Sequence, residues 1–132
     1  MIVQLIQGLA ATTGDRSPLT ESYVTQYLST SSGRILLAEM EGRVIGLLAY
    51  SLRPDLYHAA DSCLVEELVV QEDLRGRGVG SALMSELLSR LFRQNCAEVS
   101  LAVMPDKTEA IRFYKNHGLI EEALFLEKHF TQ

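Results

Sequence analysis

The feature that most constrains the fold is a glycine-rich loop between an apolar run and a long amphipathic helix. Residues 62–70 (SCLVEELVV) have the composition of a buried strand, and apolar residues recur at helical period from about Gly78 to Asn95. The loop itself contains Arg75, Gly76, Arg77, Gly78, Val79 and Gly80. Glycines allow positive φ and close approach to a ligand, and the unpaired amides at a helix N-terminus favour an anion. The loop therefore predicts a phosphate-binding site in an α/β fold.

Two common phosphate-binding motifs do not fit this loop. A P-loop ends in Gly-Lys-Ser/Thr, whereas Gly80 is followed by Ser81 and Ala82. The dinucleotide fingerprint needs a third glycine where Ser81 stands. It also needs an acidic residue at the end of the next strand, whereas Glu98 stands at the start of one. A tight turn without a ligand remains as an alternative, although alternating glycines beside arginines exceed what a turn requires.

The order of the expected elements indicates a mixed, mostly antiparallel central sheet flanked by helices. The length of 132 residues suits a single domain. Ser17-Pro18 and Thr108 are expected to start helices, Gly118 to end one, and Glu41-Gly42 to form a hairpin turn. The expected strands are residues 2–7, 34–41, 43–52, 62–70, 98–104 and 123–130, and the expected helices are residues 18–28, 78–95 and 108–117. The later strand–helix–strand unit predicts a parallel pair.

Two segments, taken together, resemble the GNAT N-acetyltransferase family. The pattern Arg-x-x-Gly-x-Gly at Arg75, Gly78 and Gly80 is similar to the family's acetyl-CoA pyrophosphate loop. Residues 110–118 (AIRFYKNHG) resemble its A-x-x-F-Y-x-x-x-G helix. The resemblance covers roughly residues 34–130. It implies one GNAT domain with the acyl-CoA N-acyltransferase fold over residues 1–132. It also implies an enzyme that transfers the acetyl group of acetyl-CoA directly to a primary amine in a ternary complex.

The resemblance also implies which residues hold the co-substrate. In this family the strand before the loop splays from its neighbour and pairs its backbone with the pantetheine arm, which indicates Leu68, Val69 and Val70. The amides that bind the pyrophosphate would be those of Arg75, Gly76, Arg77, Gly78, Val79, Gly80 and Ser81. The two arginines can add charge-assisted contacts. Lys107 is a departure, because the family often has an asparagine there that contacts the co-substrate.

Glu66 and Glu67 are the candidates for accepting the proton of the amine. Successive residues of a regular strand face opposite sides, so only one of them is expected to face the cleft. The resemblance selects Glu66, which lies four positions before Val70; Glu67 is the backup, because a bulge would exchange them. Tyr114 matches the tyrosine that many family members use to protonate the leaving thiolate. The alternatives are a pair of solvated acids and a core tyrosine.

Composition limits the partners and the compartment. The net charge of −5 argues against a nucleic-acid partner, because phosphate binding needs a basic face. The three histidines lack metal-ligand spacing, so no metal is expected. Cys63 and Cys96 are interpreted as buried free thiols. No signal peptide or apolar run long enough for a membrane span is found, which favours a cytoplasmic protein without a membrane partner.

The acceptor and the class of function leave alternatives. A small-molecule or protein amine is expected to lie against residues 53–61 and the first helix, and no motif identifies it. Homodimers are common in the family, so a second copy of the chain is included among the partners. The alternative to an enzyme is a non-catalytic module that binds acetyl-CoA or coenzyme A as a sensor. Such a module need not keep both an acid on the strand and Tyr114.

Overall fold

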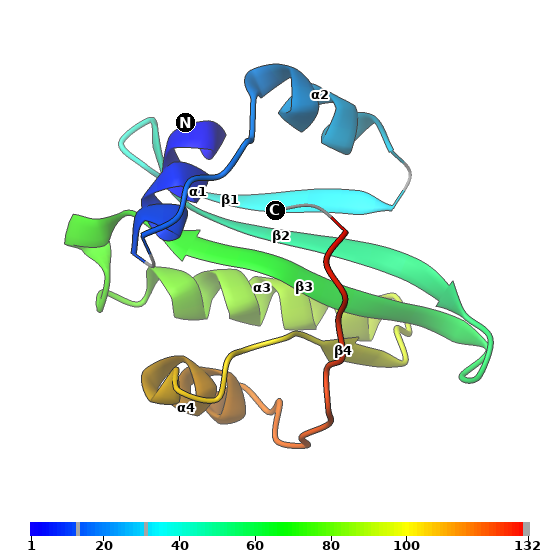
Figure 1. Cartoon of the computed structure of the whole chain (residues 1–132). Helices are drawn as coiled ribbons and strands as arrows, with labels where there is room; N and C mark the ends of the chain where they lie inside the picture. The colour runs from blue at the N-terminus through cyan, green and yellow to red at the C-terminus, as the bar shows by residue number, and fades with distance from the viewer. Residues whose placement is uncertain (13, 31, 131–132) are drawn as a thin grey trace. The chain divides into compact units, whose positions relative to one another are not determined.

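The computed structural model describes residues 1–12, 14–30 and 32–130, which fall into two compact units, Met1–Ser100 and Leu101–Gln132 (Figure 1). The first unit contains α1 (Ile2–Ala11), α2 (Glu21–Ser29), β1 (Gly33–Met40), β2 (Arg43–Asp55), β3 (Ala60–Val70), the 3₁₀ turn η1 (Glu72–Leu74), α3 (Val79–Arg93) and β4 (Glu98–Ser100). The second unit contains α4 (Thr108–Asn116).

The sheet of the first unit is mixed and mostly antiparallel, which confirms the expected fold class. Its strands lie in the order β1-β2-β3-β4; the first three are antiparallel neighbours, and β4 joins β3 in parallel after the α3 crossover. Glu41 and Gly42 form the first turn with φ of 53° and 77°, and positive φ at both positions is the geometry of a tight hairpin turn. The second hairpin is longer than expected, because β2 continues to Asp55 and β3 begins at Ala60.

One face of the sheet is covered by α3 (Figure 1). The helix buries the stripe formed by Leu83, Met84, Leu87 and Leu91. Its first turn approaches β2 closely at Gly46, where an added Cβ would lie 3.2 Å from Val79 Cγ1 and 3.1 Å from the Val69 carbonyl oxygen. A larger residue at this position would displace the start of α3, so Gly46 helps to position the glycine-rich loop.

The opposite face of the sheet is covered in part by α1, where the sequence predicted a strand over residues 2–7. That prediction is wrong. The apolar residues recur at helical spacing, and they pack on the buried residues Leu47, Ala49 and Val69. The packing residues of α1 are Ile2, Leu5, Ile6 and Leu9. An apolar stripe of this period satisfies a helix, whereas a strand would have turned half of these side chains away.

Four smaller expectations are also wrong. The helix that was expected to start at Ser17-Pro18 is α2, and its cap is Thr20 rather than Ser17. The Thr20 side chain accepts a hydrogen bond from the Tyr23 amide at 3.1 Å. Thr108 is the first residue of α4 rather than its cap. The strand expected over residues 98–104 ends at Ser100. Among the described residues 123–130 no strand forms, because a strand needs a hydrogen-bonded partner and this segment has none in the described sheet.

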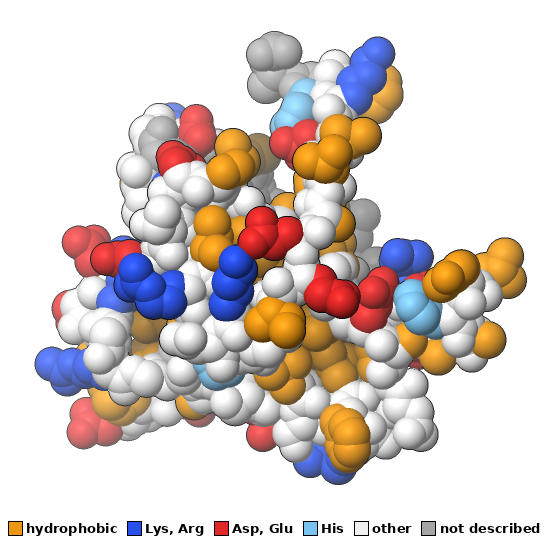
Figure 2. Space-filling view, turned by 90° about the horizontal axis from the view of Figure 1, so that it is seen from below, with side chains coloured by type: hydrophobic (Ala, Val, Ile, Leu, Met, Phe, Trp, Pro, Cys, Tyr) orange, Lys and Arg blue, Asp and Glu red, His pale blue; other side chains and the backbone are white. Residues whose placement is uncertain are grey.

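The surface bears charges of both signs. On the face drawn in Figure 2, Lys and Arg side chains lie among Asp and Glu side chains rather than in a basic stripe. This mixture of charges agrees with the small net charge of −5. No helix in the described residues is long and apolar enough to cross a membrane.

Candidate active site

A β-bulge in β3 brings two glutamates to the same side of the sheet. Glu67 pairs with Ala49 and Val65 pairs with Tyr50, so Glu66 is an extra residue between them. Ala49 belongs to the core cluster beneath α1, and directly paired residues share a face, so Glu67 lies on that face. Glu66 lies there too, because it bonds to a residue of α2. The expectation that only one glutamate can face this side assumed a regular strand and does not hold across the bulge.

Tyr27 of α2 holds Glu66. Its hydroxyl donates to Glu66 Oε1 at 2.7 Å and lies 3.3 Å from the Tyr50 carbonyl oxygen. Its ring lies against Gly33, where an added Cβ would be 3.0 Å from two ring atoms, Cε1 and Cζ. Burial, followed by the hydrogen bond and charge of Glu66, raises the pKa of Tyr27 well above its ordinary value. The phenol is therefore a neutral donor near neutral pH.

Tyr27 lies in the helix expected over residues 18–28 and was not predicted as a site residue. A signal was available. A tyrosine among apolar positions needs a partner for its hydroxyl, and a pair of acids inside an apolar strand offers one. What the sequence did not show is that Tyr27 and Glu66, 39 positions apart, meet across β2.

Glu67 has different surroundings from Glu66. It is half-buried, whereas Glu66 is exposed. Burial, and then the negative charge of Glu66, raise the pKa of Glu67. A carboxyl group whose pKa is raised toward neutrality is a better proton acceptor for an amine than an ordinary carboxylate. The bulge thus carries one carboxylate in a fixed hydrogen bond and one that burial makes more basic.

The glycine-rich loop has the geometry of an anion-binding site. Gly76 and Gly78 have φ of 80° and 85°, which favours glycine, and Gly78 caps α3 without any side-chain hydrogen bond. The first bond of α3 runs from the Ala82 amide to the Gly78 carbonyl oxygen at 3.0 Å. The amides of Val79 and Gly80 precede it and have no intrahelical acceptor. These donors and the helix dipole can hold a pyrophosphate, so the residues fit a phosphate-bearing co-substrate.

The two arginines of this loop, Arg75 and Arg77, have different surroundings. Arg75 Nε donates to the Val70 carbonyl oxygen at 3.2 Å, which fixes the side chain at the end of β3. Arg77 is exposed. A hollow of about 420 Å³ opens at this end of the sheet and is lined by Val69, Val70, Gln71, Glu72 and Arg75, and across from them by Met1, Gln4, Leu5, Gly8, Arg43 and Val44.

The parallel ladder between β3 and β4 contains three residue pairs. The pairs are Ser62 with Glu98, Cys63 with Val99 and Leu64 with Ser100. The described ladder ends there, and the segment of β3 that contains Leu68, Val69 and Val70 continues past it. An unpaired strand edge presents backbone groups that an extended ligand can bond.

Tyr114 belongs to the second unit. It lies on α4, as expected from the sequence, and its ring makes an edge contact with Phe113, with the two centroids 5.3 Å apart. The helix is followed by Gly118 with φ of 94°. Lys107 is the N-cap residue of α4 and makes no side-chain capping bond.

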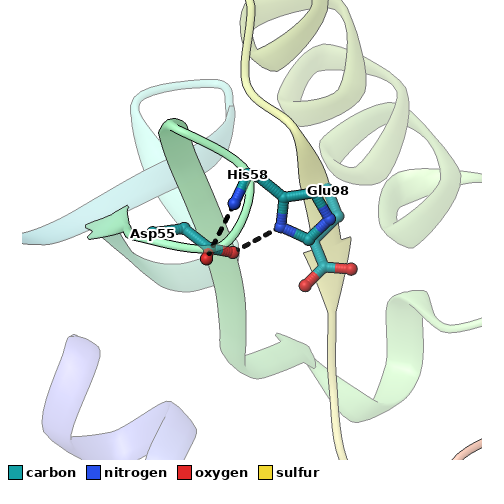
Figure 3. Close-up of side chains that lie close together, drawn as sticks. All are labelled: Asp55, His58 and Glu98. Carbon is teal, nitrogen blue, oxygen red and sulfur yellow. Dashed lines mark hydrogen bonds and ion pairs between the residues drawn. The ribbon is translucent and has the colours of Figure 1, made fainter.

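A second cluster of polar side chains lies at the tip of the β2–β3 hairpin (Figure 3). Asp55 accepts from His58 Nδ1 at 2.7 Å, the Tyr57 amide at 3.0 Å and the Ser62 hydroxyl, and Glu98 of β4 lies nearby. The hydrogen bonds from Ser62 and then His58 hold the pKa of Asp55 well below its usual range. Candidate ligand atoms of Asp55, His58 and Glu98 lie within 4.8 Å of one another. Both Asp55 oxygens accept hydrogen bonds, which join Asp55 to Tyr57, His58 and Ser62 within the hairpin.

A model of the acetyltransferase (GNAT) family matches residues 4–119. The chain belongs to the GNAT acetyltransferase family. Enzymes of this family use acetyl-CoA as co-substrate and act on amine acceptors. The matched range includes the bulge of β3, the glycine-rich loop and α4.

Similar GNAT sequences and structures support this assignment. An acetyltransferase of Sodalis glossinidius is 30% identical over 114 residues, covering 85% of this chain and 76% of that protein. The L-2,4-diaminobutyric acid acetyltransferase of Nocardia farcinica is 30% identical over 82 residues, 62% of this chain but only 41% of that protein. An aminoglycoside acetyltransferase from a soil metagenomic sample has the same fold, with a TM-score of 0.83 at 17% identity over 99% of this chain and 88% of that one.

Proposed function

We propose that the chain transfers the acetyl group of acetyl-CoA to a primary amine by direct attack in a ternary complex. The observation that carries the proposal is that one unit holds both parts of such a site. The glycine-rich loop lies at the start of α3, and two carboxylates lie at the bulge of β3, the strand that leads into that loop. Because the family match runs from residue 4 to residue 119, we treat the two units as one acetyltransferase domain.

The loop binds the pyrophosphate of the co-substrate. The Arg75 amide already donates to the Glu72 carbonyl oxygen at 3.3 Å, so the donors are the amides that follow it along the loop and the first turn of α3. Gly76 and Gly78 allow this backbone to fold around an anion. Arg77 adds a charge-assisted contact. The backbone of residues 68–70 pairs with the pantetheine arm, because the β3–β4 ladder ends before them. Acetyl-CoA supplies the acetyl group as an activated thioester.

The bulge carboxylates remove a proton from the amine. An alkylamine resembles lysine, with a pKa of about 10, so it arrives protonated and must lose a proton to attack. Glu66 or Glu67 accepts that proton, directly or through a water. The amine nitrogen then forms a bond to the acetyl carbonyl carbon, and the bond from that carbon to sulfur breaks. The departing thiolate takes a proton from Tyr114, a phenol that suits this role. The second proton that the nitrogen loses as the amide forms returns to the Tyr114 phenolate through water, and the protonated glutamate releases its proton to solvent.

The acceptor belongs to the class of small primary amines. The acidic pair and the net charge of −5 favour a cationic molecule. The Nocardia relative is named for a diamino acid, although that match spans 41% of its length. Diamines and diamino acids are therefore the first acceptors to test.

The proposal is tested by measuring thiol release from acetyl-CoA with a panel of amines. We expect release with one acceptor class. Activity should fall by about 10²-fold or more in Tyr114→Phe and in one of the two variants Glu66→Gln and Glu67→Gln, whichever removes the base. Glu21→Gln, a change at the exposed first residue of α2, serves as the matched control and should retain activity. No release with any amine, despite coenzyme A binding measured by calorimetry, would instead identify a non-catalytic module.

A further inference from the structure

We propose that Tyr27 is a positioning residue of this site, which fixes Glu66 to bind the cationic amine and leaves Glu67 to take its proton. This inference rests on the proposed function. It assigns separate roles to the two acids and adds a third residue, from α2, to the two predicted on β3.

The contacts of Tyr27 connect three strands. The ring lies against Gly33 of β1, with only 3.0 Å between the Cζ atom and the position of an added Cβ. The hydroxyl passes the Tyr50 carbonyl of β2 at 3.3 Å and reaches Glu66 Oε1 of β3 at 2.7 Å. A phenol has one proton, so the shorter bond to the carboxylate is the stronger one. The close fit against Gly33 leaves the ring little room to move, and the hydroxyl therefore fixes the position of one carboxylate oxygen.

The bulge explains why two acids require two roles. In a regular strand one of them would lie on the opposite face, beneath α3. The extra residue puts both on the α2 side, where the charge of Glu66 acts on Glu67. Tyr27 bonds to Oε1 of Glu66, and among the described residues Oε2 accepts no hydrogen bond, so it can attract an ammonium group. Glu67 is half-buried, and a buried carboxylate beside another negative charge holds a proton more firmly.

Tyr27→Phe tests the positioning role, because it keeps the ring and removes only the hydroxyl. Tyr23→Phe, on the same helix with a side chain that is 54% exposed, is the matched control. With the acceptor found in the panel, we expect kcat/KM to fall about tenfold or more in Tyr27→Phe, the loss of one hydrogen bond to a charged group. The control should match the wild type. Equal kinetics in the two variants would overturn the positioning role.

The pH profile of kcat/KM separates the roles of the two acids. Within the described residues, the pair interacts with two other titratable groups, the Tyr27 hydroxyl of α2 and, through the charge of Glu66, the Cys63 thiol of β3. In Tyr27→Phe the two glutamates lose a hydrogen-bond donor that offsets their negative charge. The acidic limb of the kcat/KM profile, where the base becomes protonated, should therefore move to higher pH. Glu66→Gln should move the limb to lower pH and raise KM for the amine. Glu67→Gln should remove the limb and lower kcat by about 10²-fold. The reverse pattern, with the limb lost in Glu66→Gln, would overturn the assignment.

A spectroscopic titration does not depend on activity. The ultraviolet absorbance of the phenolate should show one phenol, absent in Tyr27→Phe, that ionises above the ordinary range, and Glu66→Gln should lower its pKa. No change in Glu66→Gln would refute the Tyr27–Glu66 interaction. If the titration agrees but the wild type acetylates no amine, the proposed function fails and the catalytic roles fail with it.

Discussion

Two neighbouring glutamates on one strand acquire different chemistry from their surroundings. Glu66 is exposed and bonded to the Tyr27 hydroxyl at 2.7 Å, whereas Glu67 is half-buried and has a raised pKa. The difference comes from a helix far away in sequence and from the local geometry of β3. Identical side chains can therefore divide the work of a site when the backbone places them unequally.

Gly78 gives a prediction at the same scale. Its φ is 85°, and an added Cβ would meet no atom within 4 Å, so Gly78→Ala introduces backbone strain rather than a clash. We expect a loss of about 1 kcal/mol in stability and weaker binding of coenzyme A, because the start of α3 shifts. Gly14→Ala, after α1 and outside the hollow, also has a positive φ of 78° and meets open space, so it should lose stability in the same way but keep binding unchanged. Calorimetric titration of both variants with coenzyme A makes the comparison, and equal affinities would contradict a role for this backbone geometry.

The sequence identified the loop and the acids but not their third partner. Alternating glycines and adjacent acids can be recognised in a sequence, so Gly76, Gly78, Glu66 and Glu67 could be named in advance. The structure places both glycines at positive φ and both acids at the bulge. Tyr27 was not predicted, because its tyrosine signal names no partner and the contact across β2 depends on the packing of α2. A bulge was considered as an alternative but could not be predicted, since one residue inserted into an apolar strand leaves its composition unchanged.

Among the elements, those with strong local signals were predicted and those that depend on tertiary contacts were not. The β1–β2 hairpin and α3 follow from turn chemistry and a long apolar stripe. The region of α1 is short, so its apolar run was taken for a strand, and packing against Val69 and its neighbours shows the helical spacing. Residues 123–130 lack a paired neighbour in the described sheet, and local propensity alone does not make a strand.

The β2–β3 hairpin gives a prediction on pH. The folded pKa of Asp55 is depressed by bonds from Ser62 and His58, so its contribution to stability is present above the unfolded pKa of about 4 and is lost as the pH falls below it. Wild type should therefore be more stable than Asp55→Asn at neutral pH, and the gap should close in acid. Denaturant unfolding at a series of pH values measures this difference in the free energy of unfolding. A gap that is constant with pH would show that the charge of Asp55 contributes nothing.

For the whole molecule, the question is whether the units Met1–Ser100 and Leu101–Gln132 unfold as one domain. The family match spans both, so we expect one cooperative transition in calorimetry. Coenzyme A at about 100 times its Kd should raise the free energy of unfolding by about 2.7 kcal/mol and move that transition as a whole. Two transitions, of which the ligand moves only one, would show that the units are independent.

The bulge also has a genetic consequence. Removing the single codon for Glu66 would leave Val65 opposite Tyr50 and Glu67 opposite Ala49, with every flanking pair kept in place. An acidic group can thus be gained or lost at this position without any rewriting of the core on either side. Within a lineage, the chemistry of the strand can change in one mutational step while the fold that carries it is inherited intact.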